Sequence, residues 1–135
     1  PTWCPRRSDG ATAPPAEIDT LNILRATLAA MRRAILALPV AADFVLIDGR
    51  DIPAIPCEGL AIIGGDDRSL SIAAASIVAK VMRDRMLLRL DREWPAYGFA
   101  RHMGYGTQAH RDAIAAAGPC PHHRMSFAPM KNSHF

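Results

Sequence analysis

Cysteine is scarce and scattered in this sequence, which contains only Cys4, Cys57 and Cys120. The number is odd and no Cys-x-x-Cys pair occurs, so the sequence supports neither a zinc ribbon nor a disulfide framework. Reduced thiols fit a cytoplasmic protein best, and we expect that location. No apolar run approaches the length of a membrane span, and the N-terminal residues lack the apolar segment of a secretory signal. We therefore expect no membrane partner.

The sequence also lacks an initiating methionine and any internal repeat. We accordingly expect a processed or truncated chain. Its 135 residues suffice for one domain with a hydrophobic core, but not for two. Half of the residues are hydrophobic and 21% are charged, as in soluble globular proteins. The net charge of +3 permits a polyanionic partner without requiring one.

The first third of the chain predicts one long helix after an irregular lead-in. Residues 1–16 are rich in proline, which favours irregular structure. From Glu17 to Pro39, apolar residues recur every three or four positions, which is typical of one face of a helix. These residues are Ile18, Leu21, Leu24, Leu28, Met31, Ile35 and Leu38.

A short buried strand, a second short strand and two further helices are predicted next. The runs 44–47 and 60–63 are apolar and β-prone, and Pro53 and Pro56 between them exclude a strand. A helix capped by Ser69 or Ser71 runs to Pro95, with apolar residues on more than one side. A last helix follows Thr107 and stops at Gly118. This order predicts an α/β fold, or an α+β fold with helices packed on a sheet.

Two aspartates are the sharpest candidates for chemistry. Asp48 ends the first apolar run, and Asp66 follows the second run and two glycines. Carboxylates at strand ends could converge on Mg²⁺ or Mn²⁺, which prefer oxygen ligands. The alternatives are ordinary: Asp48-Gly49 is a common turn pair, and Asp66 and Asp67 suit a helix N-terminus.

Other polar residues have weaker claims. Lys80 and Asp84 lie one helical turn apart, which favours an ion pair over a catalytic role for Asp84. The loop 97–107 mixes aromatic rings, glycines and cations, which suits either nucleic-acid contact or a cover over the core. His122 and His123 follow Cys120, but their spacing is wrong for a zinc finger, and we expect a surface tail.

Several stretches, in order, closely resemble ribonuclease HII, the prokaryotic type 2 ribonuclease H. In the first half these are Leu21–Thr27 with Met31-Arg32-Arg33, Leu46-Ile47-Asp48-Gly49, and Gly65-Asp66. In the second half they are Ser69–Val81 with Arg83-Asp84-Arg85, Tyr97-Gly98-Phe99, Gly104-Tyr105-Gly106-Thr107, and His123-Arg124 with Ser126–Pro129. An ordered set of this kind is far more specific than one short motif. It covers roughly residues 17–130, which would form a partial ribonuclease H-like domain followed by a tail at 131–135.

The resemblance implies a ribonuclease H-like fold, with a mixed sheet flanked by helices. It implies a monomeric endonuclease that cleaves RNA in RNA–DNA hybrids, and at single ribonucleotides within duplex DNA, leaving a 5′-phosphate, as in ribonucleotide excision repair. The family uses four carboxylates and Mn²⁺ or Mg²⁺; Asp48 matches the third carboxylate and Asp66 the fourth. Tyr105 matches the tyrosine that packs on the deoxyribose at the RNA–DNA junction. Other substrate contacts are implied at Ser69, Ser71, Lys80 and Arg101.

The chain departs from the family at identifiable places. The family's Asp-Glu pair and Gly-Arg-Gly segment have no counterpart in residues 1–16. Gly64 and Met103 stand where lysines are usual, which removes positive charge from the nucleic-acid side. Arg50-Asp51 stands where asparagine and a basic residue are usual. We therefore expect the C-terminal portion of such an enzyme, with little or no cleavage by itself. The alternatives are a non-catalytic nucleic-acid-binding remnant and an unstable fragment with an open sheet edge.

Overall fold

The computed structural model describes residues 11–132, which divide into two compact units after Ala74. The first unit contains two helices, a small sheet and a short helix, so the predicted mixture of α and β elements is confirmed. The predicted lead-in, residues 1–16, and the tail, residues 131–135, lie mostly outside the described residues. Within the described part, no helix is both long and apolar enough to cross a membrane.

The predicted single helix in the first unit is wrong, because the chain breaks at Asn22. Helix α1 spans Pro15–Leu21 and helix α2 spans Ile23–Leu36. Asn22 has φ 72° and ψ 166°, which no helical residue can adopt. Its side chain accepts a hydrogen bond from the Arg25 amide at 3.1 Å and so caps α2. An asparagine within an unbroken apolar pattern is thus a helix start rather than a helix interior.

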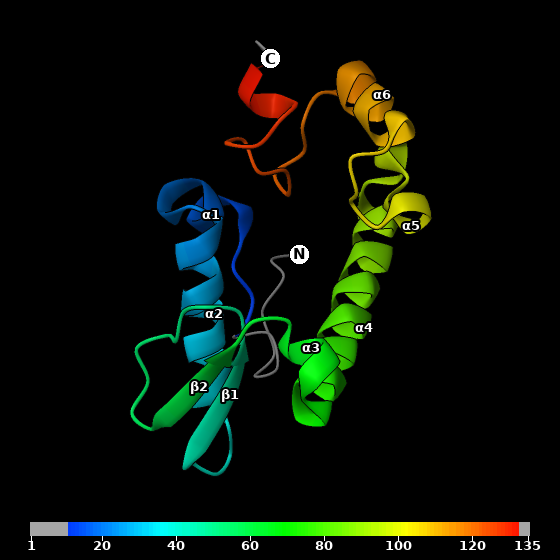
Figure 1. Cartoon of the computed structure of the whole chain (residues 1–135). Coiled ribbons are helices and arrows are strands. Elements are labelled where there is room, and N and C mark those ends of the chain that lie inside the picture. The colour runs from blue at the N-terminus through cyan, green and yellow to red at the C-terminus, as the bar shows by residue number, and fades with distance from the viewer. Residues whose placement is uncertain (1–10, 133–135) are drawn as a thin grey trace. The chain divides into compact units, whose positions relative to one another are not determined.

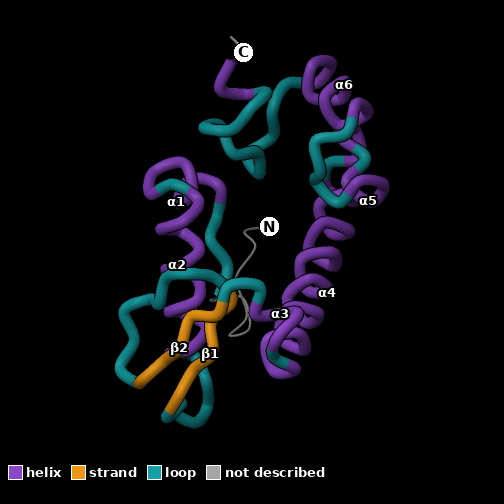
Figure 2. The backbone as a smooth tube through the Cα atoms, in the orientation of Figure 1, coloured by secondary structure: helices purple, strands orange, loops and turns teal. Residues whose placement is uncertain are grey.

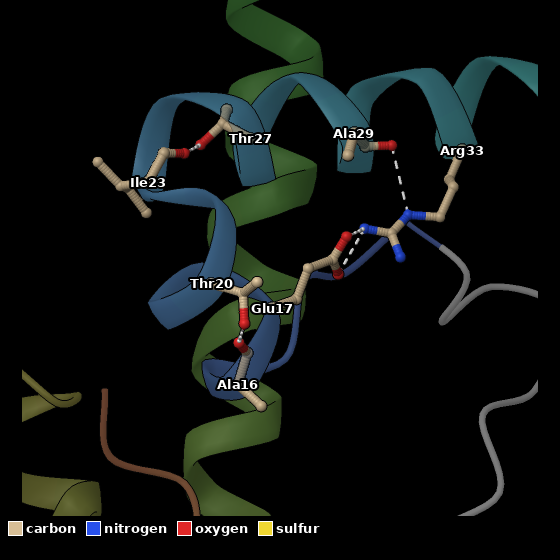
Figure 3. Close-up of polar contacts among 7 residues, drawn as sticks. All are labelled: Ala16, Glu17, Thr20, Ile23, Thr27, Ala29 and Arg33. Carbon is tan, nitrogen blue, oxygen red and sulfur yellow. Dashed lines mark hydrogen bonds and ion pairs between the residues drawn. The ribbon is translucent and has the colours of Figure 1, made fainter. Parts of the chain in front are cut away.

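An ion pair joins the two helices across this break. The Arg33 guanidinium donates to both carboxylate oxygens of Glu17 at 2.8 Å, and its Nε donates to the Ala29 carbonyl (Figure 3). Both contacts to Glu17 come from Nη2, while Nε is held by the Ala29 carbonyl, so groups of both α1 and α2 fix the position of the guanidinium. The ion pair fixes α1 against α2.

The sheet contains two parallel strands in the described residues, β1 (Phe44–Asp48) and β2 (Glu58–Ile62). They lie side by side with Leu46 opposite Leu60 and Asp48 opposite Ile62 (Figures 1 and 2). Both predicted strands are confirmed: β1 ends one residue later than predicted, and β2 begins two residues earlier and ends one residue earlier. The segment with Pro53 and Pro56 stays outside the ladder, as predicted, and Arg32 of α2 donates to the Ala54 carbonyl there at 2.7 Å.

The prediction that the first strand is buried is wrong for one face of the sheet. Side chains alternate along a strand, so Phe44 and Leu46 share a face with Asp48, and the register adds Leu60 to it. Phe44 is 53% exposed and Leu60 is 51% exposed, whereas Ile47 on the opposite face is buried. Parallel strands are normally covered on both faces. The Asp48 face of this sheet is therefore unusually open.

The second unit is helical. After the long helix α4 (Leu70–Glu93), whose first turns belong to the first unit, come η2 (Pro95–Tyr97), α5 (Phe99–His102), α6 (Gln108–Ala117) and η3 (Met130–Asn132). Pro95 follows the end of α4, Thr107 caps α6 and Gly118 ends it, all as predicted. The predicted burial of α4 on several sides is wrong: Ile77 and Val78 are exposed. The core is made by Tyr97, Phe99, Ile114, Cys120 and Met130.

Substitutions at Asn22 separate its two roles. Asn22→Ala should lower the free energy of unfolding by about 1–2 kcal/mol, since it removes the cap and keeps a side chain at positive φ. Asn22→Gly should change it by less than about 0.5 kcal/mol, because glycine adopts this conformation without strain. Urea denaturation followed by far-ultraviolet circular dichroism measures both. Equal losses for the two variants would contradict this account of the break.

Candidate functional site

Asp48 lies at the carboxyl end of β1, and its side chain reaches the segment that follows β2. Its Oδ1 accepts a hydrogen bond from the Gly65 amide at 2.9 Å. Gly64, with φ 62° and ψ 42°, turns the chain back so that this amide points at the carboxylate. The predicted tight turn at these glycines is confirmed, and its function is to connect the two strand ends.

Gly65 has no room for a side chain. A Cβ atom there would lie 2.6 Å from Cδ1 of Ile72 and 3.4 Å from Oδ1 of Asp48. Ile72 is buried in the first turns of α4, so it fills the space that a larger residue at position 65 would need. The absence of a Cβ therefore lets the backbone approach the Asp48 carboxylate.

Asp66 follows Gly65 directly, in the short helix α3 (Gly65–Arg68). Because Asp48 is bonded to the amide of the preceding residue, the backbones that carry the two predicted carboxylates are held together at this end of the sheet. Both side chains are exposed, and Oδ1 of Asp66 accepts from the Asp67 amide at 3.2 Å. Asp66 and Asp67 also lie in the first turn of α3, as the alternative interpretation required.

The donor set suits a hard divalent cation but is small. Carboxylate oxygens are the ligands that Mg²⁺ and Mn²⁺ prefer. The two hydrogen bonds described above engage Oδ1 of Asp48 and Oδ1 of Asp66, and neither engages Oδ2 of these residues. Within residues 11–132, however, no group of three or more His, Cys, Asp or Glu side chains is placed to hold a metal ion. Asp48 and Asp66 thus fit as part of a metal centre rather than as a whole one.

The remaining predicted residues divide between the units. Ser69, half-buried, and Ser71, exposed, lie near the start of α4 in the first unit. Lys80 and Asp84 lie in the second unit, where Lys80 Nζ is 2.5 Å from Oδ2 of Asp84. The predicted ion pair is confirmed, so each of these two charged side chains has a partner of opposite charge.

Tyr105 stands on the loop between α5 and α6, and its ring is 58% exposed. The Arg83 guanidinium carbon lies 4.9 Å from the centre of this ring, and Arg83 Nη2 donates to the Met103 carbonyl at 2.7 Å. Arg101, also predicted, is exposed on α5. An exposed aromatic ring beside a guanidinium group is a combination that can stack on a base or sugar and attract phosphates.

The prediction of a surface tail is wrong for Cys120 and His123. Both are buried, whereas His122, which lies between them in the sequence, is exposed. His123 Nε2 lies 3.2 Å from Nε2 of His110, and the His110 ring stacks on His102 with centroids 4.3 Å apart. One sequence signal was available: His110 lies one turn before Ile114 on the buried face of α6.

Burial changes the acid–base behaviour of this histidine cluster. Desolvation lowers the pKa of His110, opposed by its bond to the Tyr105 carbonyl and reinforced by nearby His102. Desolvation likewise lowers the pKa of His123. It raises the pKa of the Cys120 thiol, and also that of Tyr97, whose hydroxyl donates to the Gly118 carbonyl at 2.7 Å. All four groups therefore favour their neutral forms.

Comparison with known proteins identifies one family. The Ribonuclease HII family profile matches residues 7–130. The match therefore starts before residue 17, roughly where the motifs that resemble this family begin. Ribonuclease HII of Sinorhizobium fredii is 59% identical over 124 residues, covering 91% of this chain and 54% of the relative. That of Agrobacterium fabrum is 59% identical over 122 residues, and that of Xanthobacter autotrophicus is 55% identical over 121. These two alignments each cover 90% of this chain, with 56% and 49% of the respective relative.

The chain belongs to the ribonuclease HII family. It spans about half the length of the curated relatives that it matches.

The close contact at Gly65 gives a reciprocal prediction. Gly65→Ala should destabilise the first unit by about 1–3 kcal/mol, because the new methyl collides with Cδ1 of Ile72. Ile72→Val removes that carbon, so the double variant should be more stable than the sum of the two single losses implies. Urea denaturation of the four chains measures the coupling. Simple additivity would show that another contact excludes the side chain.

Proposed function

We propose that this chain supplies the Asp48–Asp66 half of the metal site of a ribonuclease H that cleaves RNA in RNA–DNA hybrids and at single ribonucleotides in duplex DNA. The observation that supports this most directly is the hydrogen bond from the Gly65 amide to Asp48. It holds two acidic residues together at the carboxyl end of a parallel sheet. The family to which the chain belongs provides the reaction class.

Asp48 and Asp66 would hold the divalent cation, Mn²⁺ or Mg²⁺. Bound there, such cations would supply Lewis-acid chemistry, which favours activation of a water molecule and stabilisation of the departing 3′ oxygen of the scissile phosphate. The contribution of this chain is positional. Asp48 sits on a hydrogen-bonded strand and its carboxylate is oriented by the Gly65 amide, so it needs little reorganisation when substrate arrives.

The second unit would supply contacts to the nucleic acid. The exposed ring of Tyr105 can pack on a sugar at the junction, and the exposed Arg101 can attract phosphates. Lys80 is already paired with Asp84, so a contact to phosphate would have to compete with that pair. The 2′-hydroxyl is the group by which a protein distinguishes RNA from DNA at the cleavage site.

By itself the chain should cleave poorly. The described residues offer two carboxylates at the proposed site and no third ligand, whereas the relatives are about twice as long as the matched segment. A chimera provides the decisive experiment, with this chain replacing the matching portion of the Sinorhizobium fredii relative. We expect Mn²⁺-dependent incision 5′ of a single ribonucleotide in duplex DNA by the chimera, and little or none by the chain alone.

In that chimera, Asp48→Asn and Asp66→Asn should each lower the rate at least about hundredfold, or roughly 2.7 kcal/mol in activation free energy. Asp51→Asn is the matched control, because it removes an exposed carboxylate outside the ladder and should leave the rate unchanged. Electron paramagnetic resonance of Mn²⁺ should show weaker binding for the first two variants only. Robust turnover by the isolated chain, abolished by Asp48→Asn, would overturn the proposed division of the site.

A second candidate function is binding of hybrid duplex without cleavage, which the exposed Tyr105 beside Arg83 favours. Fluorescence anisotropy of the isolated chain with a labelled ribonucleotide-containing duplex tests it. Tyr105→Ala should weaken binding about tenfold, as loss of a stacking ring does. Gln108→Ala, at another exposed position near this loop, should have little effect. An inactive chimera with Tyr105-dependent binding would favour this second function over the first.

A further inference from the structure

The backbone of Tyr105 is more tightly held than its exposed ring suggests. Its amide donates to the His102 carbonyl at 2.8 Å. Its carbonyl accepts from the Thr107 amide at 2.8 Å and lies 3.0 Å from Nδ1 of His110. The ring therefore projects from a loop whose main chain is fixed from within the second unit.

The bond to His110 is the last of a continuous series that begins at Cys120. Nδ1 of His123 lies 3.0 Å from the Cys120 amide, which can only donate, and 3.3 Å from the Cys120 carbonyl. We assign the shorter contact as the hydrogen bond, so Nδ1 accepts and the proton of His123 is on Nε2. That Nε2–H can donate to Nε2 of His110 at 3.2 Å. Nε2 of His110 is then the acceptor, which leaves the proton on Nδ1, directed at the Tyr105 carbonyl.

This single assignment gives every ring nitrogen in the series one role and leaves both rings neutral. A second proton is poorly accommodated. On His110 it would place two N–H groups face to face across the 3.2 Å contact. On His123 it would face the Cys120 amide at 3.0 Å, and the Cys120 carbonyl would accept it only at the longer distance of 3.3 Å. Both rings are buried and lie 5.6 Å and 5.8 Å from the centre of the Phe99 ring, so water cannot easily compensate.

We propose that His110 and His123 are positioning residues for Tyr105, holding its backbone through their neutral hydrogen-bonded pair so that the ring is oriented for nucleic acid. This rests on the proposed function, in which Tyr105 contacts the substrate. It also gives the two histidines a role distinct from metal binding, for which the cluster lacks a suitable donor set in the described residues.

Protonation of the pair releases the loop. The pKa of each ring is lowered by burial, so the neutral pair contributes its stability above the ordinary histidine value of 6.5. That contribution is lost as the pH falls below 6.5 toward the lowered pKa values. Four titratable groups surround the pair: His102 on α5, Tyr97 on η2, and Cys120 and His122 in the loop after α6. Two charged groups lie near the Tyr105 loop: Arg111 on α6, which donates to the Gly106 carbonyl, and Arg83 on α4.

The first test is nuclear magnetic resonance of the ¹⁵N-labelled full chain from pH 8 to pH 5. Long-range proton–nitrogen spectra should show His110 protonated at Nδ1 and His123 at Nε2. The Tyr105 and Gly106 amide signals should shift together with the ring signals of this pair, with a midpoint below 6.5. Tyr105 signals that do not change with the ring signals of the pair, or opposite ring tautomers, would overturn the proposal.

The second test uses two substitutions at His110 and binding to a duplex with one ribonucleotide. His110→Ala should weaken binding about as much as Tyr105→Ala, about tenfold, and should cost nothing further in the Tyr105→Ala background. His110→Asn can place an amide N–H near the position of Nδ1, so it should restore affinity and remove its pH dependence. His122→Gln is the control, with unchanged affinity.

The outcomes separate this inference from the proposed function. The losses of affinity from His110→Ala and Tyr105→Ala could instead add in the double variant and accompany a lowered melting temperature. That result would indicate a merely structural role for His110 and overturn the positioning claim. If Tyr105→Ala leaves the affinity for the duplex unchanged, while the Tyr105 amide signal of the unsubstituted chain still shifts with the histidine pair, the role of Tyr105 in substrate contact is overturned. That result would leave the control of the loop by the pair standing.

Discussion

The hydrogen bond between the Gly65 amide and the Asp48 carboxylate is the contact on which the candidate metal centre depends. It links the end of β1 to the turn after β2, so two carboxylates far apart in the sequence share one rigid support. The left-handed conformation of Gly64 directs the Gly65 amide at the carboxylate, and the absence of a Cβ at Gly65 lets the backbone come close. A larger residue at position 65 would collide with Ile72 and move the amide away from the carboxylate, and Asp66 with it.

The Asp48 side of the sheet shows the same pattern in its packing as in its polar groups. Phe44, Leu46 and Leu60 are exposed on the same face as Asp48, although apolar side chains on parallel strands are normally covered. Among residues 11–132, no third His, Cys, Asp or Glu side chain joins Asp48 and Asp66 in a group that could hold a metal ion. The chain spans about half of the length of the relatives that it matches. The open apolar face and the small set of carboxylates thus lie at the same place, which supports the proposal that this site is one part of a metal centre.

The sequence was sufficient for the elements that depend on local chemistry. Proline positions, the Thr107 cap and the Gly118 stop were predictable because each acts through its own backbone or side chain. The break at Asn22 was not, because the apolar spacing continues across it and only the backbone angles reveal the cap. The burial of Cys120 and His123 was also missed. Polar residues after a Gly-Pro pair resemble a surface tail, and only tertiary contacts with Tyr97 and Phe99 show that they complete a core.

The two proposed roles place different physical demands on polar residues. To hold a cation, Asp48 and Asp66 would have to be charged and accessible, and both side chains are exposed at the sheet end with one hydrogen bond each from the backbone. To hold the Tyr105 carbonyl, His110 and His123 would have to be neutral, and burial against Phe99 favours this because it lowers the pKa of both rings. The proposed metal binding and the proposed orientation of Tyr105 therefore rely on opposite electrostatic environments.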